Sequence, residues 1–402
     1  MLTAAAEVGL FRSVGGVSAG RYRVAVRRVV GVFLAAAIVV GGGSASGAST
    51  HTGDLPAWSP DGKHIAFVAP SRSDGGRSGQ ALSRDFRVMV TSPSGARDRA
   101  ISAVDPSEDA AELRWIDTRH VIASYSSAGE FRSIDIATGR TIDLGGSTLS
   151  PLSLAANMTF AVSRDGRRVA CTSDSPYRKQ NLTSEGRFGD VFAIRVMLSS
   201  GGPSRLLSQP IHASDAWPSL SPDGNEVVFA RSVVVHGNPI VLPPTLMIQS
   251  VSGGDARPLH ILGDSPAWSP NGRWIAYQHL VKGATPGSFV PWTLQIVHPS
   301  GGKSRTLLNA NIDDELALAW SPDSTRIAFI TGSGSLGTAT LAGKTTIFKL
   351  PGLSFDGGVP GTPPSWSPDG KKLVFAATPD ARPLETDVYV IDADGRGLRR
   401  LG

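Results

Sequence analysis

Serine, histidine and acidic residues are the first places to look for catalysis in this 402-residue chain. A nucleophilic serine needs a neighbouring base and an orienting acid, and it often sits in a G-x-S-x-G turn between a strand and a helix. One such string surrounds Ser18, inside an N-terminal leader, and Gly263-Asp264-Ser265 is followed by no helical hydrolase pattern. The eight histidines include no H-E-x-x-H pair. We therefore predict no catalytic residues.

Few residues are candidates for metal or redox chemistry. Asp392-Ala393-Asp394-Gly395 resembles the start of a calcium loop, but the acidic ligands that should follow are missing, so turn hydrogen bonding explains it better. Cys171 is the only cysteine, which excludes an intrachain disulfide and a multi-cysteine metal site. It lies in an apolar run typical of a strand, where we expect a buried, unreactive thiol. We predict no metal and no cofactor.

Basic and aromatic residues gather in four long segments between apolar runs, at about residues 70–85, 174–190, 232–244 and 279–291. Such side chains suit an acidic peptide, an anionic glycan or a cell-wall polymer, and long loops are the usual carriers of binding residues. The alternative is that these segments are tolerant, solvated insertions. The candidate ligand-binding residues are Arg72, Arg77, Arg84, Tyr177, Arg178, Lys179, Arg187, His236, His279, Lys282 and Trp292.

A repeated motif must position these segments. Trp58-Ser59-Pro60-Asp61-Gly62 is followed by the apolar run that starts at Ile65, and similar strings recur along the chain. Successive copies start 46 to 58 residues apart, which is close to the length of a four-stranded propeller blade. The other clear copies begin at Leu220, Trp268, Trp320 and Trp366, and two weaker ones begin at Trp115 and Val162.

Each motif is typical of a β-hairpin. Proline presets the second position of a type I turn, aspartate tolerates the third, and glycine supplies the left-handed residue that closes it. The sixth copy has Ser324 in place of glycine, and the second has neither proline nor glycine, so we expect these two turns to be looser or longer. We assign the motif tryptophans to packing between blades and the motif aspartates to turn amides.

The repeats predict an all-β fold. Further strands are expected at 87–91, 246–249, 294–297 and 387–391, each before a glycine-containing turn, with residues 398–401 as the last outer strand. The array begins at about Asp54 and runs to the C-terminus, which makes residues 51–402 a single domain. We predict a β-propeller of seven four-stranded blades, with six blades and an extra element as the alternative.

The Trp-Ser-Pro-Asp-Gly motif resembles the WD40-like (PD40) repeat shared by TolB and by the propellers of several serine peptidases and oligosaccharide lyases. The resemblance covers nearly all of residues 54–402. It implies a propeller blade and no particular activity. TolB-like proteins have six blades behind an α/β domain, whereas seven repeats are counted in this sequence.

The N-terminal segment has the three parts of a secretory signal. Arg27 and Arg28 precede an apolar run from Val29 to Val40, and small residues follow to Thr50. We predict a cleaved signal peptide over residues 1–50, an over-long N-terminus, and a secreted or cell-envelope location; an uncleaved leader would be the only membrane contact. Five arginines of this segment account for most of the net charge of +5, so the charge does not indicate nucleic-acid binding.

Two functional hypotheses follow. The first is an exported, non-catalytic, monomeric propeller that binds a protein or glycan of the cell envelope through its loop-rich face. The alternative is a secreted polysaccharide lyase or hydrolase with a site in the central cleft. A cleft enzyme would need His, Arg, Lys or acidic side chains from several blades to converge.

Overall fold

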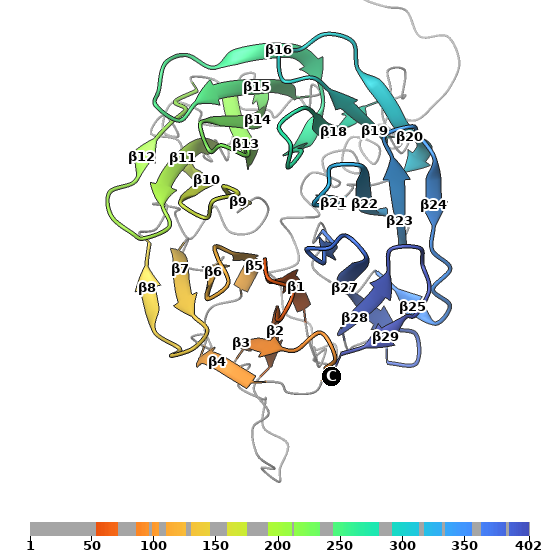
Figure 1. The fold of residues 1–402 in the computed structure, drawn as a ribbon. Helices are drawn as coiled ribbons and strands as arrows, with labels where there is room; N and C mark the ends of the chain where they lie inside the picture. Colours follow the sequence, from red (N-terminus) through yellow and green to blue (C-terminus); the bar gives the residue numbers. More distant parts are fainter. Residues whose placement is uncertain are drawn as a thin grey trace, which may run out of the picture.

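The chain folds into a closed ring of seven β-sheets (Figure 1). The computed structural model describes residues 54–70, 86–95, 99–103, 110–125, 130–144, 159–174, 192–210, 213–233, 244–280, 292–312, 317–331, 334–355, 363–382 and 386–401. These residues form 29 strands and no helix. The predicted seven-bladed, all-β propeller is therefore confirmed, and the six-bladed alternative is excluded.

The first four blades follow one another along residues 54–262, and each is an antiparallel sheet with its strands in chain order. Their strands are β1 (Asp54–Trp58), β2 (Ile65–Pro70), β3 (Phe86–Thr91) and β4 (Arg99–Ala103) in blade 1; β5 (Ala110–Trp115), β6 (His120–Tyr125), β7 (Glu130–Asp135) and β8 (Thr141–Asp143) in blade 2; β9 (Phe160–Val162), β10 (Arg168–Asp174), β11 (Phe192–Leu198) and β12 (Arg205–Leu206) in blade 3; and β13 (Ala213–Leu220), β14 (Glu226–Val233), β15 (Thr245–Ser250) and β16 (Arg257–Leu262) in blade 4.

The last three blades repeat this plan, with a split first strand in blade 7. There β25 and β26 both pair with β27, at opposite ends of its length. The strands are β17 (Asp264–Trp268), β18 (Ile275–Leu280), β19 (Trp292–Val297) and β20 (Arg305–Ile312) in blade 5; β21 (Ala317–Trp320), β22 (Arg326–Thr331), β23 (Ser335–Thr340) and β24 (Thr345–Ile347) in blade 6; and β25 (Leu353–Ser354), β26 (Ser365–Trp366), β27 (Lys372–Pro379), β28 (Asp387–Asp392) and β29 (Arg399–Arg400) in blade 7.

Apolar side chains that alternate along the strands fill the seams between neighbouring blades. The seam between blades 3 and 4, for example, packs Ile194 and Val196 against Val227 and Phe229. The motif tryptophans add a polar link at three seams. The indole N–H groups of Trp115, Trp320 and Trp366 donate to the carbonyls of Ala57, Ala267 and Ala319, each in the preceding blade, at 2.8, 2.9 and 3.0 Å. Their predicted role in packing between blades is confirmed.

The motif turns are built from the same hydrogen bonds in six blades. In blade 1 the hydroxyl of Ser59 donates to Asp61 at 2.8 Å and accepts the backbone N–H of His64 at 2.9 Å. Asp61 also accepts the N–H of Lys63 at 3.1 Å, and Gly62 takes φ of 73°. Blades 3 to 7 repeat these contacts with Asp165, Asp223, Asn271, Asp323 and Asp369. The carboxylates therefore bond turn amides, as predicted.

The prediction of looser or longer turns in blades 2 and 6 was wrong. Ser324 adopts the left-handed conformation that glycine has elsewhere (φ 59°), and its hydroxyl accepts the N–H of Asn271 in blade 5 at 3.0 Å. In blade 2, Trp115 pairs with Val121, whereas Trp58 pairs with Ile65. The blade 2 turn is therefore one residue shorter than the others. A side-chain network, described below, takes over the role of its missing proline and glycine.

Side chains close the ring between blades 7 and 1. Blade 1 contains only β1–β4 and blade 7 only β25–β29, so no strand is exchanged between the two ends of the described chain. Trp58 and Phe67 pack against Val374 and Val390, and the N–H of Trp58 donates to the hydroxyl of Ser365 at 3.0 Å. On the outer edge, Arg399 donates to the carbonyl of Ser94.

Candidate ligand-binding face

The strand order places two kinds of connection on opposite faces of the ring. The first-to-second and third-to-fourth turns lie on one face, named the turn face here. The second-to-third connections lie on the other face, named the loop face, together with the links between blades. In blades 1, 3, 4 and 5 the second-to-third connections leave β2, β10, β14 and β18 and return at β3, β11, β15 and β19. These four are the long segments expected from the sequence.

Most of the predicted binding residues lie outside the described residues. Their positions therefore stay predictions. They are Arg72, Arg77, Arg84, Tyr177, Arg178, Lys179, Arg187, His236 and Lys282. Of the other two, Trp292 begins β19 and pairs through its backbone with Leu280. His279 lies in β18, where its Nδ1 is 2.8 Å from the carbonyl oxygen of Leu262 and its ring meets Tyr277 edge-on.

His279 belongs to a set of seven equivalent positions, the fifth residue after the motif turn in each second strand. These residues, named the strand-end ring here, lie close to the loop face. The sheet registers place the following residues in the ring, from blade 1 to blade 7: Ala69, Tyr125, Ser173, Arg231, His279, Thr331 and Ala377. Only blade 4 therefore carries an arginine in this ring.

Arg231 forms a buried ion pair with Asp215 of the neighbouring strand β13. Its Nε and Nη2 donate to the two carboxylate oxygens at 2.6 and 2.7 Å, and the Asp215 side chain is fully buried. Burial raises the pKa of Asp215, while the hydrogen bond to Asp215 raises the pKa of Arg231. The hydroxyl of Ser208 also bonds the carboxylate. A bidentate pair of this kind fixes the guanidinium in one orientation.

Blade 7 has a second buried carboxylate, Asp387 in β28. It accepts the guanidinium of Arg400 at 2.9 Å and pairs with Arg382. The hydroxyl of Tyr389 lies 3.5 Å from it, and the Tyr389 ring stacks on Phe375. This cluster joins β28 and β29 to the second-to-third connection of the blade. We therefore assign it a structural role at the outer edge of the blade.

A third carboxylate, Glu112, is largely buried and lies on the innermost strand of blade 2. It accepts the N–H of Phe160 in blade 3 at 3.1 Å and pairs with Arg114. Burial raises the pKa of Glu112, although Arg114 acts in the opposite direction. The contact links two blades beside the central channel.

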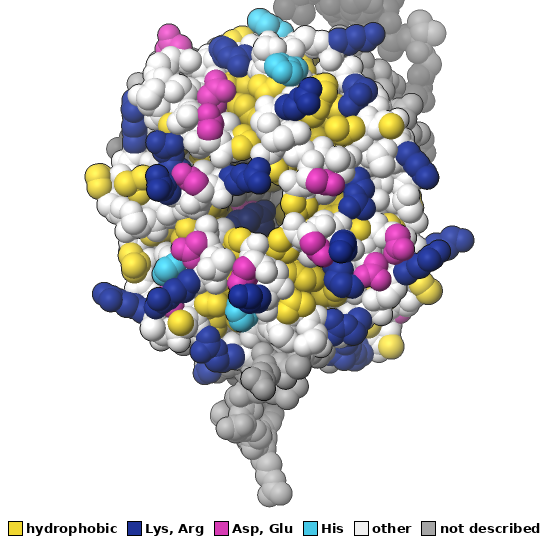
Figure 2. Space-filling view, viewed as in Figure 1, with side chains coloured by type: hydrophobic (Ala, Val, Ile, Leu, Met, Phe, Trp, Pro, Cys, Tyr) yellow, Lys and Arg dark blue, Asp and Glu magenta, His cyan; other side chains and the backbone are white. Residues whose placement is uncertain are grey.

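The central channel is partly bridged at the turn face. Arg164 occupies the motif position that is proline in five other blades, and it donates to the carbonyl of Pro270 in blade 5 at 2.9 Å. This contact skips blade 4. Figure 2 shows a hollow at the centre of the ring with Lys or Arg side chains inside it, while acidic and basic side chains are interspersed over the visible face.

Two grooves between blades stand out among the described residues. One, of about 430 Å³, is mainly apolar and lies at the seam of blades 6 and 7, where Leu336, Phe348, Leu353 and Phe355 line it. The other, of about 540 Å³, lies at the seam of blades 3 and 4. Its lining residues are Leu207, Ser208, Gln209, Pro210, Arg231, Gln249, Gly254, Asp255 and Ala256. The strand-end arginine thus lines a groove as well as pairing with Asp215.

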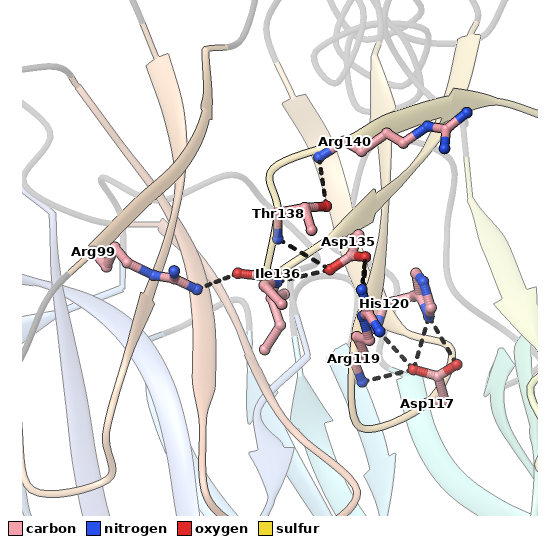
Figure 3. A network of polar contacts seen from close by, with 9 residues as sticks. Arg99, Asp117, Arg119, His120, Asp135, Ile136, Thr138 and Arg140 are labelled. Atoms are coloured by element: carbon pink, nitrogen blue, oxygen red, sulfur yellow. Dashed lines mark hydrogen bonds and ion pairs between the residues drawn. The ribbon is translucent and has the colours of Figure 1, made fainter.

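A polar network on the turn face stabilises the short turn of blade 2 (Figure 3). Asp117 accepts the N–H groups of Arg119 and His120 at 2.6 and 2.7 Å and contacts the His120 ring. Arg119 donates in turn to Asp135, which also accepts the N–H of Ala137. The hydrogen bond from Arg119 holds the pKa of Asp135 well below its usual range. Through its ring contact with Asp117, His120 caps its own turn.

Other site chemistry is sparse in the part of the chain that the structure describes. No group of three or more His, Cys, Asp or Glu side chains there could hold a metal ion. No helix there could cross a membrane. Cys171 is fully buried, and burial raises the pKa of its thiol to about 12, which confirms the expected inert thiol.

The sequence interpretation missed Arg231, Asp215 and Gln249. Aligning the repeats beyond the motif would have identified Arg231. It stands at the same spacing after Val227 as His279, a predicted binding residue, stands after Ile275. Asp215 faces Arg231 only through the β13–β14 register, which contains a bulge at Trp217 (φ 58°). No local pattern predicts that pairing.

No protein-family model and no curated protein matches the chain. Solved structures match it at low identity. An oligogalacturonate lyase in complex with manganese is 13% identical over 85% of this chain and 89% of its own, with a TM-score of 0.60. A puromycin-hydrolyzing peptidase of Mycobacterium tuberculosis is 15% identical over 88% of this chain, with a TM-score of 0.58. This chain spans only 53% of that peptidase.

TolB from Acinetobacter baumannii is also among the similar structures, at 14% identity over 84% of this chain and 79% of its own, with a TM-score of 0.45. At these identities the likeness concerns the fold alone. The matches to the lyase and the peptidase therefore show that the chain shares their propeller fold and no more.

Proposed function

We propose that the mature chain is an exported, non-catalytic propeller that binds a protein or glycan of the cell envelope through its loop face. The observation that carries the proposal is the contrast between the faces. The turn face repeats one set of hydrogen bonds in six blades, whereas the loop face has connections of very different lengths and a strand-end ring of varied residues. Variation on a rigid scaffold is the usual arrangement for recognition.

The ligand that fits this face best is anionic. The connection between β10 and β11 contains Arg178, Lys179 and Arg187 in its sequence, and the one between β2 and β3 contains Arg72, Arg77 and Arg84. Guanidinium groups recognise carboxylate and phosphate oxygens in bidentate fashion. The secretory pattern of residues 1–50 supports an envelope location for such a ligand.

A triple variant tests the proposal. Arg178, Lys179 and Arg187 are changed together to glutamine, and binding to the protein's own envelope fraction and to purified acidic cell-wall polymer is measured. Binding should fall at least about tenfold, because several charge-assisted contacts are lost at once. Unchanged binding would contradict the proposal for this connection.

The turn face supplies a matched control. Arg167, Lys371 and Arg396 are also two arginines and one lysine, and their side chains are 84%, 79% and 87% exposed. Changing these three to glutamine removes the same charge from the opposite face. An equal loss of binding in both triple variants would mean that net charge, and not the loop face, attracts the polymer.

The alternative is a lyase or hydrolase that works from the central channel. Glu112 beside the channel is the observation that supports this alternative, because a carboxyl group with a raised pKa can serve as a general acid or base. Incubation of the mature chain with oligogalacturonate, with and without manganese, distinguishes the binding function from the catalytic one. Shortened or unsaturated products that disappear in a Glu112→Gln variant would support catalysis and contradict a binding-only function.

A further inference from the structure

The groove between blades 3 and 4 contains a buried polar group whose hydrogen-bonding capacity is not used. Gln249 is 5% exposed and lines this groove. Its side-chain N–H groups donate to the carbonyls of Leu207 and Gly254 at 3.0 and 2.6 Å, which fixes the orientation of the amide. Its Oε1 is buried and has no hydrogen-bond partner among the described residues. An unpaired buried acceptor of this kind is costly, so it needs an explanation.

Gln249 is exceptional among the equivalent positions of the seven blades. It pairs with Val227, the first apolar residue after the motif turn. The residues in the same register in the other blades are Thr91, Ile134, Met197, Val297, Ala339 and Ile391. The fold can therefore fill this position with an apolar side chain, and scaffold packing alone does not require a glutamine there.

The same groove contains the singular residue of the strand-end ring. Asp215 occupies Nε and Nη2 of Arg231, and since a guanidinium has five N–H groups, three remain outside the pair. Gln249 and Arg231, whose residue types are not repeated at the equivalent positions of the other blades, thus line one groove. One offers an acceptor, and the other offers donors.

We propose that this groove binds a short, neutral oligosaccharide. A sugar hydroxyl both donates and accepts, so it can accept from the N–H groups of Arg231 that Asp215 leaves outside the pair. Because Oε1 of Gln249 is buried, the groove wall must shift slightly around the ligand before a second hydroxyl can donate to it. The charge of Arg231 is already balanced by Asp215, and Asp255 lies exposed at the rim, which disfavours an anionic ligand. Leu207, Pro210 and Ala256 give apolar surface for the C–H faces of the sugar rings.

The groove has a suitable size. Its volume of about 540 Å³ falls inside the range of roughly 300–1,000 Å³ that is usual for small-molecule sites. None of the lining residues belongs to the long connections of the loop face, and the proposal does not depend on the role proposed for those connections.

Calorimetric titration of the mature chain with cellobiose, maltose and di-N-acetylchitobiose tests the proposal, with digalacturonate as the anionic comparison. At least one neutral disaccharide should bind, and digalacturonate should bind more weakly. In Gln249→Met, which copies Met197 of blade 3, affinity should fall about tenfold through the loss of one buried hydrogen bond. If none of the neutral disaccharides binds, or digalacturonate binds best, the proposal is wrong.

A second variant covers the possibility that Gln249→Met does not fold. Gln209 is exposed at the groove, so Gln209→Trp fills the groove from outside and leaves every buried hydrogen bond in place. It should abolish disaccharide binding while the melting temperature stays unchanged. The triple variant of Arg178, Lys179 and Arg187 should bind the disaccharide normally. Undiminished binding to a folded Gln209→Trp protein would place the sugar elsewhere and overturn the proposal.

Discussion

Two rings of seven equivalent positions lie at opposite ends of the second strands, and they differ sharply. At the turn face, the residue after the motif's first position is serine in six blades and Ile116 in blade 2. At the loop face, the strand-end ring contains six residue types in seven blades. The serines share one task, which is to accept a turn N–H and donate to the next carboxamide or carboxylate. The strand-end residues share no task, so this end of each blade is free to differ.

The comparison distinguishes residues that form the structure common to the blades from residues that differ from one blade to another. Where a residue makes the same contact in six of the seven blades, its role is structural, as the serine hydroxyls illustrate. Where one blade departs from the other six, as blade 4 does with Arg231 and Gln249, a local reason is needed. Substitutions at the two ends of the blades should therefore have different effects.

The largest effect is expected from Arg231→Ala in the strand-end ring. The change leaves the fully buried carboxylate of Asp215 without its cation, which should cost about 3–5 kcal/mol of unfolding free energy. Urea denaturation measures the loss. The double variant Asp215→Ala with Arg231→Ala should recover most of it, because blade 2 already has Ala110 at the position of Asp215. Equal stability of the single and double variants would mean that the carboxylate of Asp215 carries no cost once its cation is removed.

Gly166→Ala in the turn of blade 3 should have the next largest effect. A Cβ atom at Gly166 would lie 2.1 Å from the carbonyl oxygen of Ile116 in blade 2, at a φ of 72°. We expect a loss of about 3 kcal/mol, because strain from left-handed backbone adds to a clash with rigid backbone.

Gly272→Ala is the matched control for that substitution. It has nearly the same φ, 73°, and its added Cβ would meet only Pro222 at 3.7 Å. It should lose about 1–2 kcal/mol from backbone strain alone. Thermal or urea unfolding of both variants gives the difference, and similar losses in the two would mean that the contact between blades 2 and 3 is not tight.

The outline of the fold could be predicted from the sequence because each blade carries its own turn chemistry. Ser-Pro-Asp-Gly is a local signal, and its five clear and two weaker copies indicated seven hairpins at nearly regular spacing. The failure at blade 6 came from a contact between blades. Ser324 closes its turn as glycine would because a bond from Asn271 in the preceding blade supports it, and that partner is 53 residues away in the sequence.

The candidate site was less predictable for the same physical reason. The pair of Asp215 with Arg231 and the bonds of Gln249 to Leu207 depend on strand register and on packing between blades, which no single motif encodes. His279 was singled out from the sequence by its residue type. Its place in the ring beside Arg231 became apparent only once the strands were aligned in space.

A smaller effect is expected when the two rings are compared within blade 3. Ser163 in the turn donates to Asp165 at 2.6 Å and accepts the N–H of Arg168 at 2.9 Å. Among the described residues, the side chain of Ser173 in the strand-end ring makes only a long contact of 3.4 Å to the carbonyl of Ala193. Ser163→Ala should cost about 1–2 kcal/mol and Ser173→Ala less than about 0.5 kcal/mol. Denaturant midpoints measured for both variants test this order, and its reversal would invalidate the comparison of the rings.

The smallest effect concerns acid sensitivity and uses the one turn that has asparagine. The hydrogen bond from Ser221, followed by the N–H of Asn225, lowers the pKa of Asp223. A lowered folded-state pKa stabilises the fold above the unfolded value of about 3.9, and this stability is lost as pH falls through the folded pKa. Asp223→Asn, which copies Asn271, should therefore shrink the drop in melting temperature between neutral and acid pH. The reciprocal Asn271→Asp should enlarge that drop. If both variants lose stability in acid as the parent does, the turn carboxylates contribute nothing to its pH dependence.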